Sequence, residues 1–594
     1  MTIRFSPKKP HSKLIKFGTL DLETENRIYF KMGGIYDGSN YKEFWSLSSL
    51  VEYLQETDIS IFYVHYLSFD APIIMNYLLE HCIDFAPPTE VNGKVIELRV
   101  KSSNKKRKYV RLRDSFSLFP DSQANLVKSF GVETSKFEIN DWSNVSDEDF
   151  VKRNYQDVKG LFEIMLKAQQ YFFGLLGVDI SRSSTISQLT KDSFQTKFLK
   201  QSLINPLLHG YGRNFFLDEQ MNKDFRDSYA GGRTEVFDFD EHEEVKVFDV
   251  NSMYPACMLD DVPIERPVVK EDVSVEYFNH LRKKYYVIAD VEITLKTDRI
   301  PLLWTRHEGK LLFTDFEESR GTFHSPEIDK AVELGAKILR VFRVYVFRQK
   351  APIFKEYIEF LYALRLKAKK NKDKFQDYLC KLLMNSLYGK FAQNPERDKL
   401  IFLNDRQYLN DDYPPNTLVY ADDTGFFYGR VKEFSPASFY FPHWSGCITA
   451  RARVKLFEFL VESDCPVYCD TDSVMCHSLN SERVSKKLGD MKLEKTYYDF
   501  IAVQPKVYAH RDGWKAKGIP RQFGDEPFEV LFDGVVWDSV GSLRSSLNVV
   551  NNVESDNGLI KVIKRRRHIN KSYSKSRVVN GKGVPFLLAN NQLK

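Results

Sequence analysis

Short apolar runs alternate with amphipathic stretches over the first 185 residues. Residues 17–22 and 59–65 have the length and the side chains of strands, whereas residues 71–80 and 147–169 place apolar side chains at helical spacing. Strands that alternate with helices in this way predict an α/β domain.

After residue 185 the pattern is less regular. We expect a strand at 244–249, mixed strands and turns at 259–350, helices at 353–370, 373–388 and 448–463, a turn-rich stretch at 393–425, a tight hairpin at 467–476, and short strands with basic turns over the last ~70 residues. A chain of 594 residues predicts three to five domains, at roughly 100–200 residues for each.

Composition and charge add only local information. The net charge is +5, but residues 561–577 hold eight Lys or Arg and no acidic residue, and Lys105, Lys106, Arg107 and Lys108 form a second basic cluster. Such clusters suit a phosphate backbone, although a solvated surface explains either one equally well. Aromatic residues make up 14% of the chain, which suits a protein that stacks on bases.

The seven cysteines are scattered and show no paired CxxC spacing. Cys465 and Cys469 are the closest two, and nothing in the sequence completes a zinc set, so we expect structural thiols in a reducing compartment. No signal peptide is evident, and no stretch approaches ~20 apolar residues. We therefore expect a soluble cytoplasmic protein, in the host cell if it is viral.

Two carboxylates at the predicted hairpin give the first chemical signal. Asp470 and Asp472 flank Thr471, and positions i and i+2 of a strand share one face, so both carboxylates point to one place. Like charges at that separation repel unless cations bind between them, and hard oxygen ligands suit Mg²⁺. Asp249, at the end of a predicted strand, supplies a third carboxylate for a two-metal nucleotidyl transfer. An Asx-rich turn is the simpler interpretation of Asp470 and Asp472 alone.

A predicted helix carries a matching set of side chains. Lys381, Asn385 and Tyr388 lie near one face, where a lysine binds a triphosphate and a tyrosine stacks on a base. An ordinary amphipathic helix that ends at Gly389 explains the same spacing. Tyr254, five residues after Asp249, is placed to stack under an incoming sugar, or it is a core aromatic residue before Pro255.

A second carboxylate set lies near the N-terminus. Asp21 and Glu23 share one face at the end of a strand, Asp70 opens a predicted helix, and Asp157 lies near the front of another. Four carboxylates of this kind hold two metals for phosphodiester hydrolysis. For Asp70 alone, a helix N-cap is the simpler explanation.

Three motifs in chain order resemble motifs A, B and C of family B DNA polymerases: DxxxxYP at 249–255, KxxxNSxYG at 381–389 and YxDTDS at 468–473. The N-terminal set resembles the DEDD motifs of proofreading 3′–5′ exonucleases. Tyr66 and Arg153 stand where that family has Asn and Tyr, which puts efficient proofreading in doubt. The segments at 229–233, 449–453 and 506–508 resemble YxGG, Tx2GR and KxY motifs, and together they indicate the protein-primed subgroup of small tailed phages and linear plasmids.

The resemblance implies roles for individual residues. Two Mg²⁺ per active site, replaceable by Mn²⁺, would be held by Asp249, Val250, Asp470 and Asp472 for synthesis and by Asp21, Glu23, Asp70 and Asp157 for proofreading. The dNTP would contact Val250, Tyr254, Arg365, Lys369, Lys381, Asn385 and Tyr388. DNA would contact Ser115, Phe116, Tyr229, Gly231, Gly232, Thr449, Arg453, Lys506 and Tyr508.

The resemblance also implies an α/β and α+β multidomain fold, with an RNase H-like exonuclease followed by a right-hand polymerase. The expected domains are the exonuclease (1–185), the palm (186–258 and 426–520), an insertion that contacts terminal protein and DNA (259–352), the fingers (353–392), a second insertion for processivity and strand displacement (393–425) and the thumb (521–594).

We expect a monomeric enzyme that replicates a linear viral or plasmid genome. Its expected partners are template and primer DNA, dNTPs, a terminal protein whose hydroxyl primes synthesis, and a single-strand DNA-binding protein. Two alternatives stay open: a nucleic-acid-primed family B polymerase, and a single-strand nuclease or binding protein whose palm no longer synthesises DNA.

Overall fold

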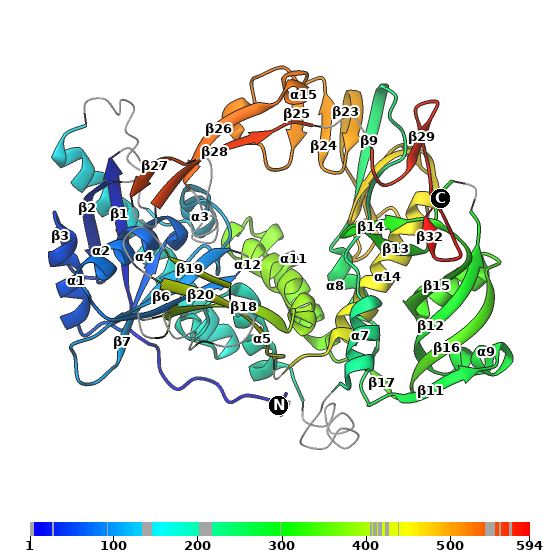
Figure 1. Ribbon diagram of the computed structural model, residues 1–594, viewed down its shortest axis with the longest axis horizontal. Helices are drawn as coiled ribbons and strands as arrows, with labels where there is room; N and C mark the ends of the chain where they lie inside the picture. The colour runs from blue at the N-terminus through cyan, green and yellow to red at the C-terminus, as the bar shows by residue number, and fades with distance from the viewer. Residues whose placement is uncertain are drawn as a thin grey trace.

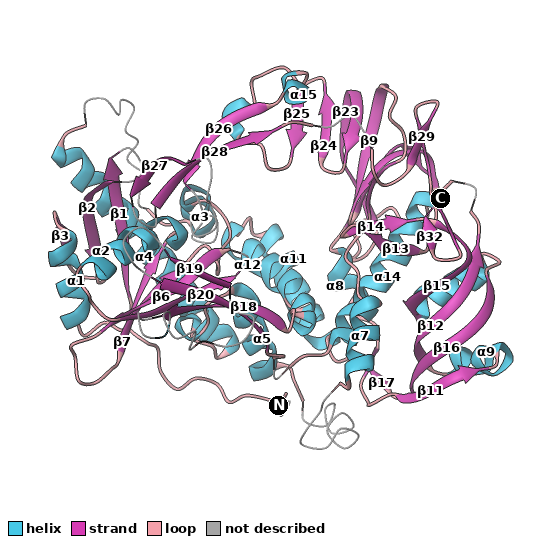
Figure 2. Ribbon diagram, viewed as in Figure 1, coloured by secondary structure: helices cyan, strands magenta, loops and turns pink. Residues whose placement is uncertain are grey.

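The computed structural model describes residues 5–25, 29–91, 93–133, 145–200, 217–297, 299–403, 407, 413, 418–421, 427–437, 439–540, 553–557, 560–569 and 573–593. Figure 1 shows a blue N-terminal sheet at the left, green and yellow elements at the right, and the helices α11 and α12 between them. Figure 2 shows that both sides combine sheets with helices.

The N-terminal part is built on a seven-stranded sheet of order β3-β2-β1-β4-β7-β6-β5. β4 is parallel to β1 and β7, and the other neighbours are antiparallel. The strands are β1 (Gly18–Glu25), β2 (Tyr29–Tyr36), β3 (Tyr41–Phe44), β4 (Ile61–Val64), β5 (Phe85–Val91), β6 (Lys94–Lys101) and β7 (Tyr109–Asp114).

Helices cover this sheet because its strands are apolar on both faces. α4 (Asp147–Leu176) contacts β1 and β2, and α2 (Leu67–Glu80) contacts β6 and β7. Two separate apolar clusters result, one with α4 and one with α2 and α1 (Leu47–Glu56). Two further helices, α3 (Gln123–Phe130) and α5 (Ile186–Lys197), pack against α4.

A second seven-stranded sheet, of order β25-β24-β23-β9-β22-β21-β8, carries the other carboxylates. Its strands are β8 (Thr234–Val236), β9 (His242–Val250), β21 (Ser463–Asp470), β22 (Ser473–Leu479), β23 (Met491–Gln504), β24 (Val507–His510) and β25 (Gly513–Ala516). β9 alternates its side chains between two apolar clusters. Phe248 and Val250 join the cluster of α8 (Met253–Cys257) and α14 (Pro442–Val461), whereas Val245 and Val247 join Tyr497, Phe500 and Tyr508.

A third sheet, of order β11-β16-β12-β15-β31-β32, is built mainly from residues 268–347. It comprises β11 (Val268–Val273), β12 (Tyr286–Leu295), β15 (Asp315–His324), β16 (Lys337–Phe347), β31 (Leu587–Ala589) and β32 (Gln592–Leu593), with α9 (Val275–Lys284), α10 (Ser325–Glu333) and the hairpin of β13 (Trp304–His307) and β14 (Lys310–Phe313). The chain's last strands extend this sheet, because β31 lies parallel to β15, and Figure 1 shows the red C-terminal segment among the green strands.

The ends of this third region meet in a short pair, β10 (Val262–Pro263) with β17 (Lys350–Ala351). The chain continues through α11 (Lys355–Lys370), α12 (Lys374–Ser386) and the 3-10 turn η3 (Tyr388–Ala392). It then forms a three-stranded sheet of β18 (Glu396–Leu403), β20 (Phe427–Phe434) and β19 (Leu418–Ala421). In this sheet β18 contacts β5 of the N-terminal sheet. The remaining elements are η2 (Ile180–Arg182), α7 (Glu219–Asp227), η4 (Arg521–Phe523), α15 (Val530–Asp533), β26 (Val535–Val540), β27 (Val553–Asn557), β28 (Ile560–Arg567), β29 (Arg577–Val579) and β30 (Lys582–Val584).

The predicted helices and the hairpin are confirmed, with shifts at their ends. α14 begins at Pro442 instead of residue 448, and the helix expected to reach residue 388 ends at Ser386, so that Tyr388 lies in the 3-10 turn. The N-cap explanation for Asp70 is wrong, because α2 begins at Leu67 and Asp70 is a buried residue of its first turn. Among the described residues, no helix is both long and apolar enough to cross a membrane.

Candidate active site

Strand pairing brings Asp249 and the Asp470–Asp472 turn together. Asp249 lies opposite Ser473, and the amide of Val250 donates a hydrogen bond of 2.7 Å to the carbonyl oxygen of Asp472. Thr471 takes the left-handed conformation (φ 64°), which makes the turn between β21 and β22 tight enough to carry both carboxylates. The pairing of β9 with β22 thus brings Asp249 next to Asp472, although the two residues lie far apart in the sequence.

The carboxylates of this site repel one another in a partly buried setting. Burial, followed by the negative charge of Asp472, raises the pKa of Asp249 to about 7, against the opposing effect of Lys381. Burial and the charge of Asp470 likewise raise the pKa of Asp472. Carboxylates with raised pKa values are harder to ionise together. A hard divalent cation bound between them suits such a site, because it offsets the repulsion between their negative charges.

Asp470 is paired with Lys506, whose ammonium occupies the carboxylate oxygens that a metal ion would bind. The Nζ of Lys506 donates to both oxygens of Asp470, at 2.6 Å each, and the amide of Lys506 donates to the hydroxyl of Tyr468. As far as the described residues go, the three carboxylates do not form a set whose ligand atoms all lie within 4.8 Å of one another. A cation bound to Asp470 would have to compete with the Lys506 ammonium.

Cations surround the Asp249 side of the site. Lys381, exposed on α12, acts electrostatically on both Asp249 and Asp472. Burial and the positive charges of Arg365, Lys492 and Lys381 lower the pKa of Lys369, which indicates a crowded group of cations. A group of this kind attracts a polyanion such as a triphosphate.

Arg365 is already partly satisfied within the protein. Its guanidinium donates to Asp377 at 2.8 Å and to the hydroxyl of Ser252 at 3.0 Å, and the side chain is almost buried. It therefore ties α11 to the turn after β9. Asn385 is exposed on α12, one turn beyond Lys381.

Tyr254 and Tyr388 stack on each other, with ring centroids 4.4 Å apart and planes 21° from parallel. Burial raises the pKa of Tyr254 to about 12, so its hydroxyl stays protonated at neutral pH. The stack joins α8 to η3 near Asp472, whose charge acts on both tyrosines, and forms a flat apolar surface at the site.

The segment 229–233 packs directly against the Asp470–Asp472 turn. The carbonyl oxygen of Arg233 accepts from the amide of Thr471 at 2.7 Å, and a methyl group on Gly232 would lie 2.7 Å from the Thr471 Cγ2. Tyr229 is half-buried, and Gly231 is exposed with nothing within 4 Å of the position of an added methyl group. Gly232 is therefore the glycine that the close approach requires.

Thr449 and Arg453 lie on the buried side of α14. The Arg453 guanidinium forms an ion pair of 2.8 Å with Glu327, and both side chains are 1% exposed. It also donates to the carbonyl oxygen of Ala230 at 2.6 Å. Arg453 therefore positions the 229–233 segment from the buried interior. A direct contact between Arg453 and DNA stays a prediction.

Tyr508 is buried among aromatic rings and lies 5.9 Å from Tyr468, centroid to centroid. Together with the Lys506 contacts, this packing joins β24 to the strand that ends at Asp470. The three segments expected to contact DNA are therefore connected to the Asp470–Asp472 turn, directly or through one another.

The second candidate site lies at one end of the N-terminal sheet. One ligand atom from each of Asp21, Glu23 and Asp157 lies within 4.8 Å of the other two. Burial, followed by the charges of Glu23, Asp70 and Asp157, raises the pKa of Asp21 well above its usual range, and burial does the same for Asp70. Four mutually repelling carboxylates in one place are suited to divalent cations.

Arg153 occupies this site as well. Its Nε lies 3.6 Å from Glu23 and 3.8 Å from Asp157, and its charge lowers the pKa of Asp21 against the larger opposing effects. The residue that departs from the exonuclease pattern thus contributes a cation next to the carboxylates, where a bound metal would compete with it.

The sequence did not predict one polar residue at each of the two sites. Asn154 donates to the carbonyl oxygen of Asp21 at 3.1 Å, and its own amide oxygen accepts from the hydroxyl of Tyr41. Gly34, opposite Asp21 in the sheet, leaves room for this amide, because a methyl group there would overlap Asn154. The pair of glycines in β2 was the available signal. Lys492 was missed in the other site, where it lies opposite Asp249 on β23.

Aromatic side chains lie beside the N-terminal carboxylates. Tyr66, in the left-handed conformation and 46% exposed, contacts the Phe116 ring edge-on, and the Lys94 ammonium lies 4.8 Å from the centre of that ring. The hydroxyl of Ser115 is hydrogen-bonded to His65 at 3.0 Å. Exposed aromatic rings of this kind are where unpaired bases stack in proteins that bind single-stranded nucleic acid.

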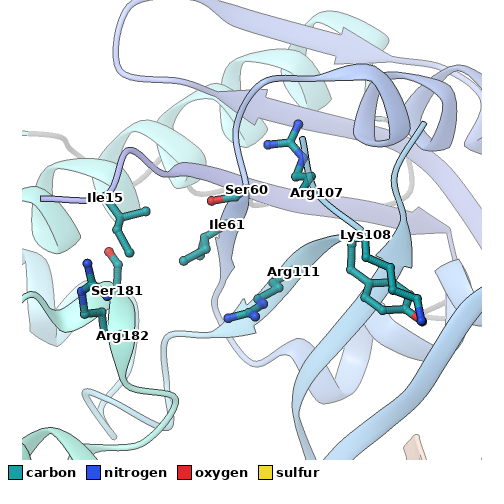
Figure 3. Close-up of a pocket in the computed structure, with 9 residues that line it drawn as sticks. Ile15, Ser60, Ile61, Arg107, Lys108, Arg111, Ser181 and Arg182 are labelled. Carbon is teal, nitrogen blue, oxygen red and sulfur yellow. The ribbon is translucent and has the colours of Figure 1, made fainter. Parts of the chain in front are cut away.

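A separate cavity of about 470 Å³ lies elsewhere in the N-terminal part, and Figure 3 shows its lining side chains. Arg107 and Lys108 of the predicted basic cluster line it together with Arg111 and Arg182. None of the predicted site residues lines this cavity.

Comparisons with known proteins agree with this geometry. The family described as DNA polymerase type B, organellar and viral, matches residues 137–424. The chain is 25% identical to the DNA-directed DNA polymerase of Enterobacteria phage PRD1, over 85% of this chain and 84% of the relative, and 24% identical to the DNA polymerase of Bacillus phage phi29, over 90% and 93%.

Solved structures show the same fold. The phi29 DNA polymerase complexed with primer-template DNA and incoming nucleotide substrates is 19% identical and has a TM-score of 0.71, covering 94% of this chain and 100% of that one. The predicted mixed α/β, multidomain architecture is confirmed at this level. With the ordered motifs, the two carboxylate sites and these relatives taken together, the chain is a DNA-directed DNA polymerase similar to the family B enzymes of phages phi29 and PRD1.

Proposed function

We propose that Asp249, Asp470 and Asp472 hold two Mg²⁺ ions for template-directed nucleotide addition. The pairing of β9 with β22 carries this proposal, because it brings Asp249 beside Asp472 in a partly buried place, where a divalent cation relieves the repulsion between carboxylates. Bound Mg²⁺ would supply activation of the primer hydroxyl and charge stabilisation on the triphosphate. The carbonyl oxygen of Val250 is a further candidate ligand.

The chain's own residues bind and orient the substrates in this proposal. Lys381, Lys369 and Lys492 attract the triphosphate, Asn385 faces it from α12, and the Tyr254–Tyr388 stack supports the sugar and base. Lys506, which now pairs with Asp470, would be free to contact the primer end if a cation took its place at Asp470.

Asp249→Asn should reduce the rate of single-nucleotide addition by roughly 10³-fold, about 4 kcal/mol of barrier, because one metal ligand and its charge are lost. Asp260→Asn, at an exposed carboxylate just beyond α8, is the matched control and should keep the rate. Rapid-quench primer extension measures both. Equal rates for the two variants would contradict the proposed role of Asp249.

The same variant has an effect on stability whose sign follows from the raised pKa. The folded state binds a proton at Asp249 up to about pH 7, so this group destabilises the metal-free fold as pH rises from 3.8 to 7. Asp249→Asn should therefore raise the free energy of unfolding above pH 7, by on the order of 1 kcal/mol after solvent screening. The gain should vanish near pH 4, as measured by urea unfolding in EDTA.

Gly232→Ala should lower the rate of polymerisation by roughly tenfold, about 1.4 kcal/mol, while it leaves exonuclease activity unchanged. The added methyl group would lie 3.1 Å from the Thr471 Cα and would displace the turn that carries Asp470 and Asp472. Gly231→Ala, where the methyl group meets nothing within 4 Å, should have the smaller effect. If the two variants rank in the opposite order in primer extension, the close approach does not matter for synthesis.

We propose that the N-terminal site is a 3′–5′ exonuclease in which Asp21, Glu23, Asp70 and Asp157 hold the metal ions. The convergence of three of these carboxylates and the burial of the fourth support the proposal. Tyr66, Phe116 and Ser115 would receive the unpaired primer end. The Arg153 cation stands in the same site, so the metal must compete with it.

A variant with both Asp21→Ala and Asp70→Ala should lose end-degradation of single-stranded DNA by at least about 10²-fold while it keeps primer extension. Asp84→Ala, at an exposed carboxylate of the same domain that is paired with Lys101, is the control and should degrade DNA normally. In the wild type, the Mg²⁺ needed for half-maximal degradation should fall as pH rises, because Asp21 and Asp70 have raised pKa values. Degradation that persists in the double variant would sink the assignment.

We propose that synthesis starts on the hydroxyl of a terminal protein. The sheet of residues 268–347 supports this, since the pairing of β10 with β17 closes it off as an insertion between the Asp249 strand and α11. That is the place where the protein-primed subgroup carries its terminal-protein contact. Priming by a nucleic acid is the alternative.

Wild-type enzyme incubated with the protein encoded next to its gene, Mg²⁺ and labelled dNTPs should transfer one nucleotide covalently to that protein, detected on a denaturing gel. The Asp249→Asn variant should leave the protein unlabelled. If an enzyme preparation that extends a DNA primer labels no protein encoded on its genome, the nucleic-acid-primed alternative is correct.

A further inference from the structure

The three strands that meet at Asp249 and at the Asp470–Asp472 turn, β9, β21 and β22, also carry a second cluster at their opposite ends. His242 begins β9, Cys465 lies near the start of β21, and His477 lies near the end of β22. One ligand atom from each of these residues lies within 4.8 Å of the other two. His242 is seven residues before Asp249, or roughly 23 Å along an extended strand, so this cluster is separate from the proposed Mg²⁺ site.

The sheet register places these side chains together. Asp464 pairs with Ser478 and Pro466 with Cys476, which puts Cys465 directly opposite His477 across the β21–β22 ladder. The Nδ1 of His242 lies 3.0 Å from the Nε2 of His477. Two ring nitrogens bound to one tetrahedral zinc ion at about 2.0–2.1 Å are separated by little more than this distance.

A buried nitrogen in the cluster has no hydrogen-bond partner. His242 is 8% exposed, and its Nε2 makes no hydrogen bond within the protein. The Oδ2 of Asp238 lies 3.6 Å from this nitrogen and 3.8 Å from the Cys465 sulfur. A carboxylate next to a metal-binding histidine commonly orients the ring through its second nitrogen.

We propose that His242, Cys465 and His477 bind one zinc-class divalent cation, with Asp238 as the orienting carboxylate. A thiolate with two imidazoles is a soft donor set that selects zinc over magnesium. Cys465 binds as the thiolate, and its proton passes to solvent. His477 is exposed, which gives the ion a route of entry.

The ion would fix the register of β9, β21 and β22 from the end opposite the catalytic turn. It would also act on the C-terminal hairpin, because Lys582 of β30 forms an ion pair with Asp238, and the amide of Phe239 donates to the carbonyl oxygen of Gly581. The site therefore connects the catalytic strands with the end of the chain and has a structural role.

The first test is metal content. Full-length protein, purified without a histidine tag and dialysed after zinc loading in excess Mg²⁺, should retain about one zinc per chain by mass spectrometry of the metal. Cys465→Ser and His477→Ala should each lose it, whereas Cys82→Ser and His307→Ala, at exposed residues elsewhere in the protein, should keep it. A wild-type protein that retains no zinc overturns the proposal.

A second measurement does not depend on whether the variants fold. Cobalt bound to the wild type should give a thiolate-to-cobalt charge-transfer absorption, and zinc should protect Cys465 from alkylation, as read by peptide mass spectrometry. Cys82 should be alkylated equally with and without zinc. Alkylation of Cys465 that zinc leaves unchanged would overturn the site, while primer extension in the same sample tests the polymerase function separately.

Discussion

The pairing of β9 with β22 is the constraint on which the polymerase site depends. It places Asp249 opposite the residue that follows Asp472, and a single bond between the Val250 amide and the Asp472 carbonyl oxygen fixes the two strands at that point. The consequence is electrostatic, because carboxylates brought together in a partly buried place repel one another. Burial and, after it, the charge of Asp472 raise the pKa of Asp249, and both effects are relieved when a divalent cation binds.

The remaining parts of the site are arranged around this turn. Gly232 and the carbonyl oxygen of Arg233 approach it from one side, and Lys506 and Tyr468 hold Asp470 on another. Arg453 and Glu327, a fully buried ion pair, support the 229–233 segment from inside the protein. Removing one partner of such a pair leaves an uncompensated buried charge, typically at a cost of about 3–5 kcal/mol. Hydrogen bonds from Arg453 and from the Thr471 amide thus hold the 229–233 segment against the Asp470–Asp472 turn.

The N-terminal site also brings buried carboxylates close together, but on a different sheet. Carboxylates from β1, α2 and α4 meet at one sheet end, and Gly34 allows Asn154 to reach Asp21. Arg153 offsets part of their repulsion. If this site is the proposed exonuclease, a metal ion would have to compete with the Arg153 charge, which a tyrosine at this position would not supply.

Sequence patterns identified the strands, helices and carboxylates because each depends on local periodicity or on a short motif. The hairpin at Asp470 and the helix of Lys381 were visible for this reason. The contacts of Arg453, Arg365 and Lys506 were not, since they depend on partners as distant in sequence as Glu327, Ser252 and Asp470.

The same limit hid other long-range features. Cysteine spacing gave no sign that His242 and His477 lie beside Cys465, because β-sheet pairing alone brings them together. Nor did the sequence indicate that β31 returns to pair with β15, a contact between residues more than 250 positions apart.

The central claim is that residues 249, 470 and 472 converge on a pair of divalent cations once Lys506 releases Asp470. A crystal structure of the wild-type enzyme with Mn²⁺, primer-template DNA and a non-reactive dNTP analogue tests it most directly. The account predicts two anomalous-scattering peaks bound by these three carboxylates, with the Lys506 ammonium displaced from Asp470. Peaks bound elsewhere, or an intact Lys506–Asp470 pair in that complex, would contradict it.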